Sequence, residues 1–127
     1  MNFKPILIVP GETKSVFFEI FFKSMKLKTY LSPLILICDK RTLDKEKKKY
    51  KFNKKINQIF LKDINNKHVF KKEIYLIDVK KQKNNFYVHD CFEVAFKLIK
   101  EGFSHKLING PINKTKTLKK KYLGITE

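Results

Sequence analysis

Short runs of apolar, largely β-branched residues recur along the chain, separated by longer amphipathic or charged segments. Several runs stop at glycine, proline or aspartate, which is typical of buried strands that end in turns. We expect strands at 6–9, 34–38, 56–61 and 73–79, and a further strand that begins at Leu107. Because helical or charged segments separate the strands, the pattern predicts an α/β fold. Its sheet is mainly parallel, with helices on both faces.

Two of the intervening segments carry apolar residues three and four apart, the spacing of an amphipathic helix. The first helix is expected after the N-cap Ser15, with an apolar face of Val16, Phe17, Ile20, Phe21 and Met25. The second is expected after Asn84 and Asn85, with an apolar face of Val88, Cys91, Phe92, Ala95 and Ile99. Gly102 is expected to end it with a positive φ. The charged segment 40–50 forms either an exposed helix or a poorly ordered one.

The length of 127 residues fits one α/β domain, spanning 1–127. The net charge is +17, which has two interpretations: a surface for nucleic acid or anionic membranes, or lysines that are simply solvated. Arg41 is the only arginine among 29 basic residues, whereas nucleic-acid readers favour arginine. The aromatic residues also lie in apolar runs and not between the lysines. Composition therefore favours solvated lysines over a nucleic-acid partner.

We expect the chain to be cytoplasmic and to have no membrane partner. No apolar run approaches the roughly 20 residues that span a bilayer. Cys38 and Cys91 lack the spacing of a disulfide framework or metal site, so we expect buried free thiols. The histidines, His68, His89 and His105, lack the spacing of a helical metal site as well.

The stretch after Leu107 holds the candidate chemistry. An apolar run stops at Gly110 and Pro111, and a polar loop with Lys114 follows. In open α/β sheets, ligands bind at the carboxyl ends of the strands. The turn Pro10–Glu12 also follows a strand, so we expect it at the same edge. Lys114 offers a mobile cation for an anionic group, and Thr126 offers a hydroxyl for a substrate oxygen.

Several segments together resemble one enzyme family. They are Ile8–Glu12, the stretch 85–88 with the helix after it, 107–114 with its Gly-Pro-Ile-Asn-Lys, and 122–127 with its Gly-Ile-Thr-Glu. These segments resemble the first part of 4-hydroxythreonine-4-phosphate dehydrogenase. The resemblance implies a fold similar to isocitrate and isopropylmalate dehydrogenases. It also implies that the chain is an N-terminal fragment of a longer protein, with an incomplete sheet.

The family resemblance implies a concrete activity. The family oxidises the hydroxyl of 4-phosphooxy-threonine, a phosphorylated hydroxy-amino acid, with NAD or NADP, and the keto acid then loses carbon dioxide. This reaction serves pyridoxal 5′-phosphate biosynthesis. A divalent metal stabilises the developing alkoxide. The family is a cytoplasmic homodimer with its active site between subunits. By resemblance, the substrate-binding residues here are Gly110, Lys114 and Thr126, and the metal ligands are expected outside this chain.

The sequence also departs from the family. Ile125 stands where the family has a substrate-contacting histidine, and 13–16 replaces a glycine-rich loop, although Glu19 fits the later acidic position. We therefore expect the 127-residue chain alone to lack dehydrogenase activity. Two alternatives stay open. One is a small basic α/β module that binds RNA or another polyanion. The other is a degenerate paralogue that keeps the fold without catalysis.

Overall fold

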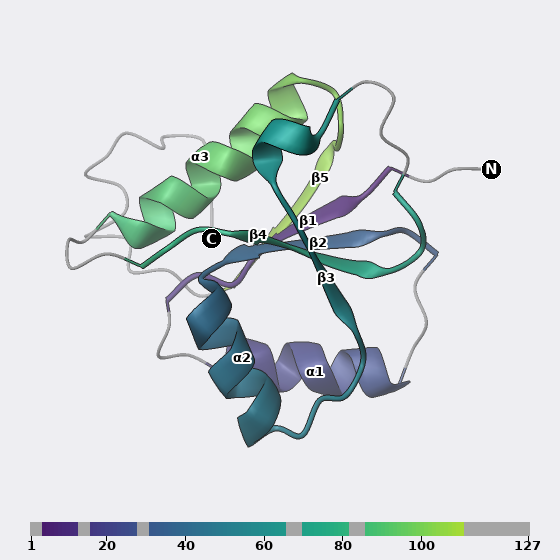
Figure 1. The fold of residues 1–127 in the computed structure, drawn as a ribbon, viewed down its shortest axis with the longest axis vertical. Helices are drawn as coiled ribbons and strands as arrows, with labels where there is room; N and C mark the ends of the chain where they lie inside the picture. The colour runs from purple at the N-terminus through teal and green to yellow at the C-terminus, as the bar shows by residue number, and fades with distance from the viewer. Residues whose placement is uncertain (1–3, 13–15, 28–30, 66–69, 82–85, 111–127) are drawn as a thin grey trace.

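A computed structural model describes residues 4–12, 16–27, 31–65, 70–81 and 86–110, and these form a five-stranded sheet (Figure 1). The strands are β1 Ile6–Val9, β2 Leu34–Cys38, β3 Ile56–Ile59, β4 Ile74–Asp78 and β5 Lys106–Asn109. Their order is β3-β4-β2-β1-β5, and every pair of neighbours is parallel. The prediction of a mainly parallel α/β fold is confirmed.

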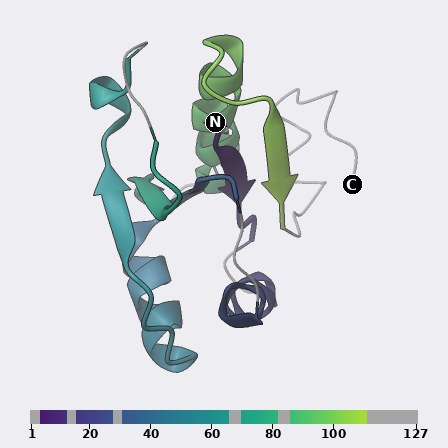
Figure 2. The ribbon, with the colours of Figure 1, turned by 90° about the vertical axis from the view of Figure 1, so that its right-hand side faces the viewer.

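Helices cover both faces of the sheet, as expected (Figures 1 and 2). Helices α1 Phe17–Leu27 and α2 Lys40–Lys49 pack on one face, and α3 Tyr87–Lys100 packs on the other. A short 3₁₀ helix, Leu61–Asp63, follows β3 and lies with the α3 layer. The sheet therefore separates two hydrophobic clusters, one on each face.

The burial of the central strand β2 explains why its position could be predicted from the sequence. All five of its residues are buried, because sheet neighbours flank it and helices cover it. Ile35 and Ile37 face the α3 layer, whereas Leu36 and Cys38 face α1 and α2. A strand buried on both faces has an uninterrupted apolar run. The expected bounds of this strand match the observed ones.

The predicted apolar face of α1 is partly wrong. Val16 and Ile20 are each 59% exposed, whereas the buried residues are Phe18, Phe21, Phe22 and Met25. Phe22 stacks on Phe52, from the loop after α2, with ring centroids 4.5 Å apart. The helix carries large apolar residues on more than one side, so the spacing did not identify the side that packs. Packing against the sheet and Phe52 selects that side.

The charged segment 40–50 forms an exposed helix, one of the two expected alternatives. Leu43 is its one buried residue. The helix ends in a Schellman motif, in which the Phe52 N–H donates to the Lys47 carbonyl and the Lys51 N–H donates to the Lys48 carbonyl. Lys51 occupies the left-handed position with φ 53°, where glycine is usual.

We expect the substitution Lys51→Gly to stabilise the fold by about 0.5–1 kcal/mol, because it removes the Cβ strain of a left-handed residue. Urea denaturation followed by far-UV circular dichroism measures the change. Lys51→Ala is the matched control, because it removes the charge but keeps the Cβ. If alanine stabilises the fold as much as glycine does, the gain comes from charge and not from φ.

The remaining elements agree closely with expectation. The buried face of α3 includes Leu98, and Ile99 is only partly buried. Gly102 has φ 84°, and Phe103 packs against the core, as the predicted helix end requires. The expected caps Ser15, Asn84 and Asn85 lie outside the described residues. Strand β3 ends at Ile59, two residues before the predicted end. In the described part of the chain, no helix is long and apolar enough to cross a membrane.

Candidate functional site

The carboxyl edge of the sheet contains a switch point between β2 and β4. From β2 the chain turns to the face that carries α2, and from β4 it leads to the opposite face, which carries α3. Adjacent strands that exit to opposite faces leave a crevice, and ligands of open α/β proteins commonly bind there. The side chains at this crevice therefore decide whether it is available to a ligand.

Asp39 occupies the crevice. Its side chain is buried, with 7% of the residue exposed. Oδ1 accepts hydrogen bonds from the backbone N–H groups of Arg41 at 2.7 Å and Thr42 at 3.3 Å, which caps α2. Oδ2 accepts a hydrogen bond of 2.6 Å from the Lys81 N–H, beyond β4. One carboxylate thus joins the start of α2 to the chain that follows β4.

A second carboxylate makes the reverse connection. Asp78, the last residue of β4, accepts a 2.8 Å hydrogen bond at Oδ1 from the Lys40 N–H. The Val79 N–H donates to the Cys38 carbonyl at 3.0 Å. The first-turn N–H groups of Lys40, Arg41 and Thr42 therefore all have carboxylate partners. We infer that these hydrogen bonds join the chain after β2 to the chain after β4 and close the crevice to a ligand. Asp39 is therefore a structural residue.

The floor of the crevice is a buried group of weak acids. The Tyr87 hydroxyl accepts a 2.6 Å hydrogen bond from the Asp39 N–H and contacts the Cys91 thiol. Burial raises the pKa of the Cys91 thiol to about 12 and also raises the pKa values of Tyr87 and Cys38. Both cysteines are buried and free, as predicted. Because the thiolate is the reactive form, neither thiol is suited to act as a nucleophile at neutral pH.

The second place of interest lies between the carboxyl ends of β1 and β5. These strands are neighbours, with Val9 opposite Asn109, and the Gly110 N–H donates to the Val9 carbonyl at 2.8 Å. A Cβ on Gly110 would lie 2.0 Å from the Pro10 carbonyl oxygen and 2.8 Å from Phe17 Cδ1. The loops after β1 and β5 therefore begin in direct backbone contact. The prediction that the Pro10 and Gly110 turns share one edge is confirmed.

The other predicted site residues lie beyond this contact. Gly110 is the last described residue, and Lys114, Ile125 and Thr126 lie outside the described residues. Their substrate contacts remain predictions, as does a direct substrate contact by Gly110. What the structure adds is a packing reason for the glycine. No side chain fits where the two loops meet, so the backbone of the candidate loop starts against Pro10.

The described residues do not fit a metal ion, because they contain no group of three or more histidine, cysteine, aspartate or glutamate side chains placed to hold one. His89 lies near carboxylates of its own helix, 3.8 Å from Asp90 and 3.7 Å from Glu93. His105 immediately precedes β5, and His68 lies outside the described residues. We therefore derive no chemical step through a metal.

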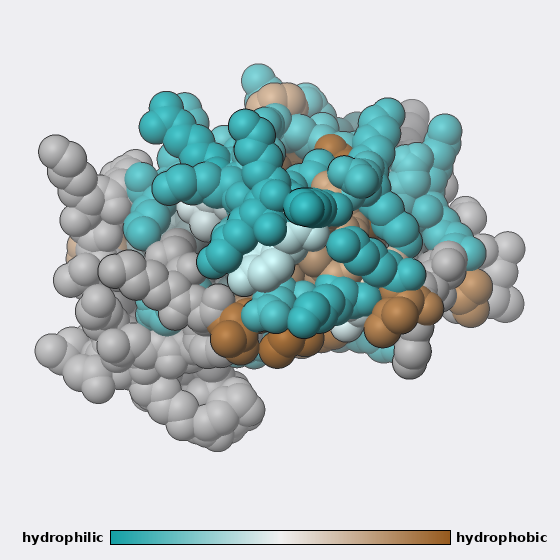
Figure 3. Space-filling model, turned by 90° about the horizontal axis from the view of Figure 1, so that it is seen from below, coloured by the Kyte–Doolittle hydropathy of each residue, from teal (hydrophilic) through white to brown (hydrophobic). Residues whose placement is uncertain are grey.

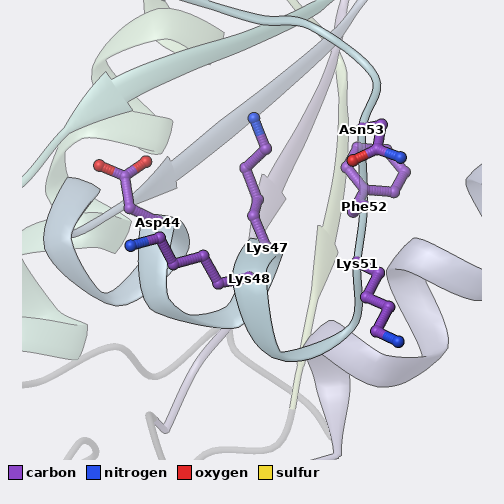
Figure 4. A pocket seen from close by; sticks show the side chains of 6 residues that line it. All are labelled: Asp44, Lys47, Lys48, Lys51, Phe52 and Asn53. Carbon is purple, nitrogen blue, oxygen red and sulfur yellow. The ribbon is translucent and has the colours of Figure 1, made fainter.

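A basic hollow of about 570 Å³ lies at the end of α2 and is lined in part by Lys47, Lys48 and Lys51 (Figure 4). The ammonium groups of these lysines point in three different directions, and Asp44 also borders the hollow. Lysines in the last turn of a helix also complement the negative end of its dipole. The hollow therefore lacks the convergent donors that a single bound anion requires.

Comparison with known proteins agrees with this architecture. The sequence matches no model of a known protein family and no curated protein. A search of solved structures finds six similar chains, one of which aligns with a TM-score of 0.69 over 91% of this chain. That structure is a 4-hydroxythreonine-4-phosphate dehydrogenase. It comes from Burkholderia phymatum, is 17% identical, and is covered over 38% of its own length. At this identity the likeness establishes the fold alone, an α/β fold with a parallel sheet and helices on both faces.

Proposed function

We propose that this chain is a cytoplasmic α/β domain that forms the substrate-holding part of an enzyme related to 4-hydroxythreonine-4-phosphate dehydrogenase. Its ligand would be 4-phosphooxy-threonine or a similar phosphorylated hydroxy-amino acid of pyridoxal phosphate biosynthesis. The observation that carries this proposal is the contact of Gly110 with Val9 and Pro10. This contact brings together the loops after β1 and β5, which both belong to segments that resemble the family. They meet at the edge of the sheet where ligands of open α/β proteins bind.

The proposed roles follow from the chemistry of the side chains. Lys114 supplies a cation for the phosphate, because an ammonium group makes charge-assisted hydrogen bonds to phosphate oxygens. Thr126 supplies a hydroxyl for a substrate oxygen, and Gly110 lets the loop backbone lie close to the first loop. The described residues provide no metal cluster. NAD or NADP, the divalent metal and the homodimer belong to the proposed complete enzyme, so we propose that the 127-residue chain binds substrate without turning it over.

We expect isothermal titration calorimetry to detect binding of 4-phosphooxy-L-threonine and Lys114→Ala to weaken it about tenfold, as for a lost charge-assisted hydrogen bond. Lys116→Ala is the matched control, because it removes a neighbouring cation outside the Gly-Pro-Ile-Asn-Lys segment. Production of NADH from NAD with the same substrate should be undetectable. Equal weakening by both variants would mean that net charge alone attracts the ligand. Turnover by this chain would contradict its assigned role.

The alternative function, binding of RNA or another polyanion, is favoured by one observation. Helix α2 presents six basic and two acidic residues on an exposed surface. If this surface binds RNA, affinity should fall at least about tenfold between roughly 50 and 200 mM salt, because counterions are released on binding. Fluorescence anisotropy with a labelled single strand measures this, with Lys47→Glu as the test and the exposed Lys100→Glu of α3 as the control. A flat salt dependence would exclude this function.

A further inference from the structure

The strand β3 forms an open edge of the sheet. Among the described residues it pairs with β4 only, and Figure 2 shows it along the outer side of the sheet. The N–H and C=O groups that point away from β4 therefore have no strand partner in the described part of the chain. Such an edge can accept a further extended segment through main-chain hydrogen bonds.

An exposed aromatic residue continues this edge at the carboxyl end of β3. Phe60 directly follows the strand, its backbone is extended with φ −110° and ψ 135°, and it is 53% exposed. Because side chains alternate along an extended chain, Phe60 lies on the same face as Gln58 and Ile56. Ile56 packs against the cluster under α1 and α2, whereas Gln58 is exposed. This end of the edge thus offers an apolar contact that the fold leaves half exposed.

The amino end of β3 is strongly basic. Residues 40–55, which run from α2 to the start of β3, include nine basic and two acidic residues. The basic hollow lined by Lys47, Lys48 and Lys51 belongs to this segment, and Asn53, just before β3, borders it as well. Figure 3 shows a largely hydrophilic surface over the side of the molecule that carries α1 and α2. One open edge therefore has an aromatic contact at one end and a cluster of cations at the other.

The geometry of the basic hollow suits several carboxylates better than one anion. Its ammonium groups point in three directions (Figure 4), so no single anion can contact all of them. Acidic side chains spaced along a polypeptide can instead pair with the lysines one by one, and the net charge of +17 attracts such a segment. A nucleic acid could use the lysines but not the main-chain groups of β3. The same positive charge repels the lysine-rich strand of a second copy of this chain.

We propose that β3 binds an extended acidic segment of another protein, which adds to the sheet antiparallel to β3. Antiparallel pairing is slightly more stable per residue than parallel pairing. The partner's strand lies along the open edge, an apolar side chain near its start packs on Phe60, and the acidic residues that follow the strand lie at the basic hollow. This proposal concerns a protein partner and is independent of the proposed substrate.

Fluorescence anisotropy of the full chain with a labelled peptide tests the proposal. The peptide has alternating threonine and valine residues followed by a run of glutamates. We expect Lys48→Glu to weaken its binding about fivefold, through a reversed surface charge, and Phe60→Ala to weaken it about tenfold, through a lost aromatic contact. Lys100→Glu is the matched control for charge, because both lysines are exposed in the last turn of a helix. Ile108→Ala is the control for the apolar contact, because Ile108 is 52% exposed on β5, at the opposite edge of the sheet.

Amide hydrogen exchange followed by NMR separates strand addition from attraction by charge. A saturating amount of the peptide should slow exchange of amides in β3 at least about tenfold and leave those of β5 unchanged, because β3 alone gains main-chain partners. A second peptide of glutamates without the threonine and valine residues should bind more weakly and leave exchange in β3 unchanged.

Absence of binding by the first peptide at about 50 mM salt, where attraction between charges is little screened, would overturn the proposal. Binding without slower exchange in β3, or equal weakening by Lys48→Glu and Lys100→Glu, would also overturn it. So would binding that persists in Phe60→Ala and is matched by a single strand of RNA, because the surface would then recognise polyanions in general. Circular dichroism checks that each variant keeps the fold. Titration with 4-phosphooxy-threonine is a separate readout, so failure of one proposal leaves the other standing.

Discussion

Replacing Gly110 with alanine is expected to lower the free energy of unfolding by about 3 kcal/mol, near the upper end of the overpacking range. The added Cβ would meet the Pro10 carbonyl oxygen at 2.0 Å and Phe17 at 2.8 Å. The first of these atoms is backbone, so relief requires the loop after β1 to move away from β5. Urea denaturation measures the loss. We also expect weaker binding of 4-phosphooxy-threonine, because the two candidate loops would separate.

Gly102→Ala is the matched control. Gly102 has φ +84°, but a Cβ there would meet nothing within 4 Å. Its substitution should therefore cost only about 1 kcal/mol, the penalty of a left-handed alanine. The comparison separates backbone strain from steric exclusion. If Gly110→Ala lowers the free energy of unfolding no more than Gly102→Ala does, the two loops do not approach as closely as the structure shows. The observation that supports the proposed site would then be lost.

Replacing Asp39 with alanine is expected to lower the free energy of unfolding by about 3 kcal/mol. The substitution removes the cap of α2, which typically contributes about 1 kcal/mol. It also leaves the Lys81 N–H without its 2.6 Å carboxylate partner, and a lost hydrogen bond to a charged group adds about 1.5–3 kcal/mol. Denaturation by urea gives the total. Asp39→Asn should recover the capping part, because asparagine also caps helices well.

Asp78→Ala provides the comparison for Asp39. Asp78 accepts a single described backbone hydrogen bond, from the exposed N–H of Lys40, so we expect a loss of about 1 kcal/mol. A loss at Asp39 no larger than that at Asp78 would show that the crevice between β2 and β4 is not held by the buried carboxylate. The crevice would then be available to a ligand, contrary to our inference.

The closure of the crevice between β2 and β4 determines where we place the proposed substrate. A parallel sheet of this kind offers its switch point as the default ligand site. Here Asp39 and Asp78 link the two exits through backbone N–H groups, and the buried Tyr87 lies beneath them. At the same edge of the sheet, the loops after β1 and β5 are in direct backbone contact. For that reason we place the proposed substrate beside Gly110, and not between β2 and β4.

Much of the site could not be predicted from the sequence. Asp39 was recognised only as the end of a strand, although an aspartate directly before a helix is the usual sign of an N-cap. Its bond to Lys81 joins residues 42 positions apart, and no local pattern encodes that partner. Gly110 was identified by its place after a strand, but its packing against Pro10 depends on β5 lying beside β1. Pairing of distant strands is a property of the whole sheet.

The sequence by itself determined the five strands, the positions of α1 and α3 and the parallel α/β class, whereas it left the segment of α2 open between an exposed helix and a poorly ordered one. Buried strands and amphipathic helices leave short-range patterns, because each residue's burial follows from the local period. Only the tertiary structure decided the strand order, the side of α1 that packs and the surface that remains open. Helix α1 is apolar on several sides, and the side that packs against the sheet and Phe52 carries Phe22, which leaves Ile20 outside. Such choices depend on which distant surfaces meet, and the local sequence pattern does not record them.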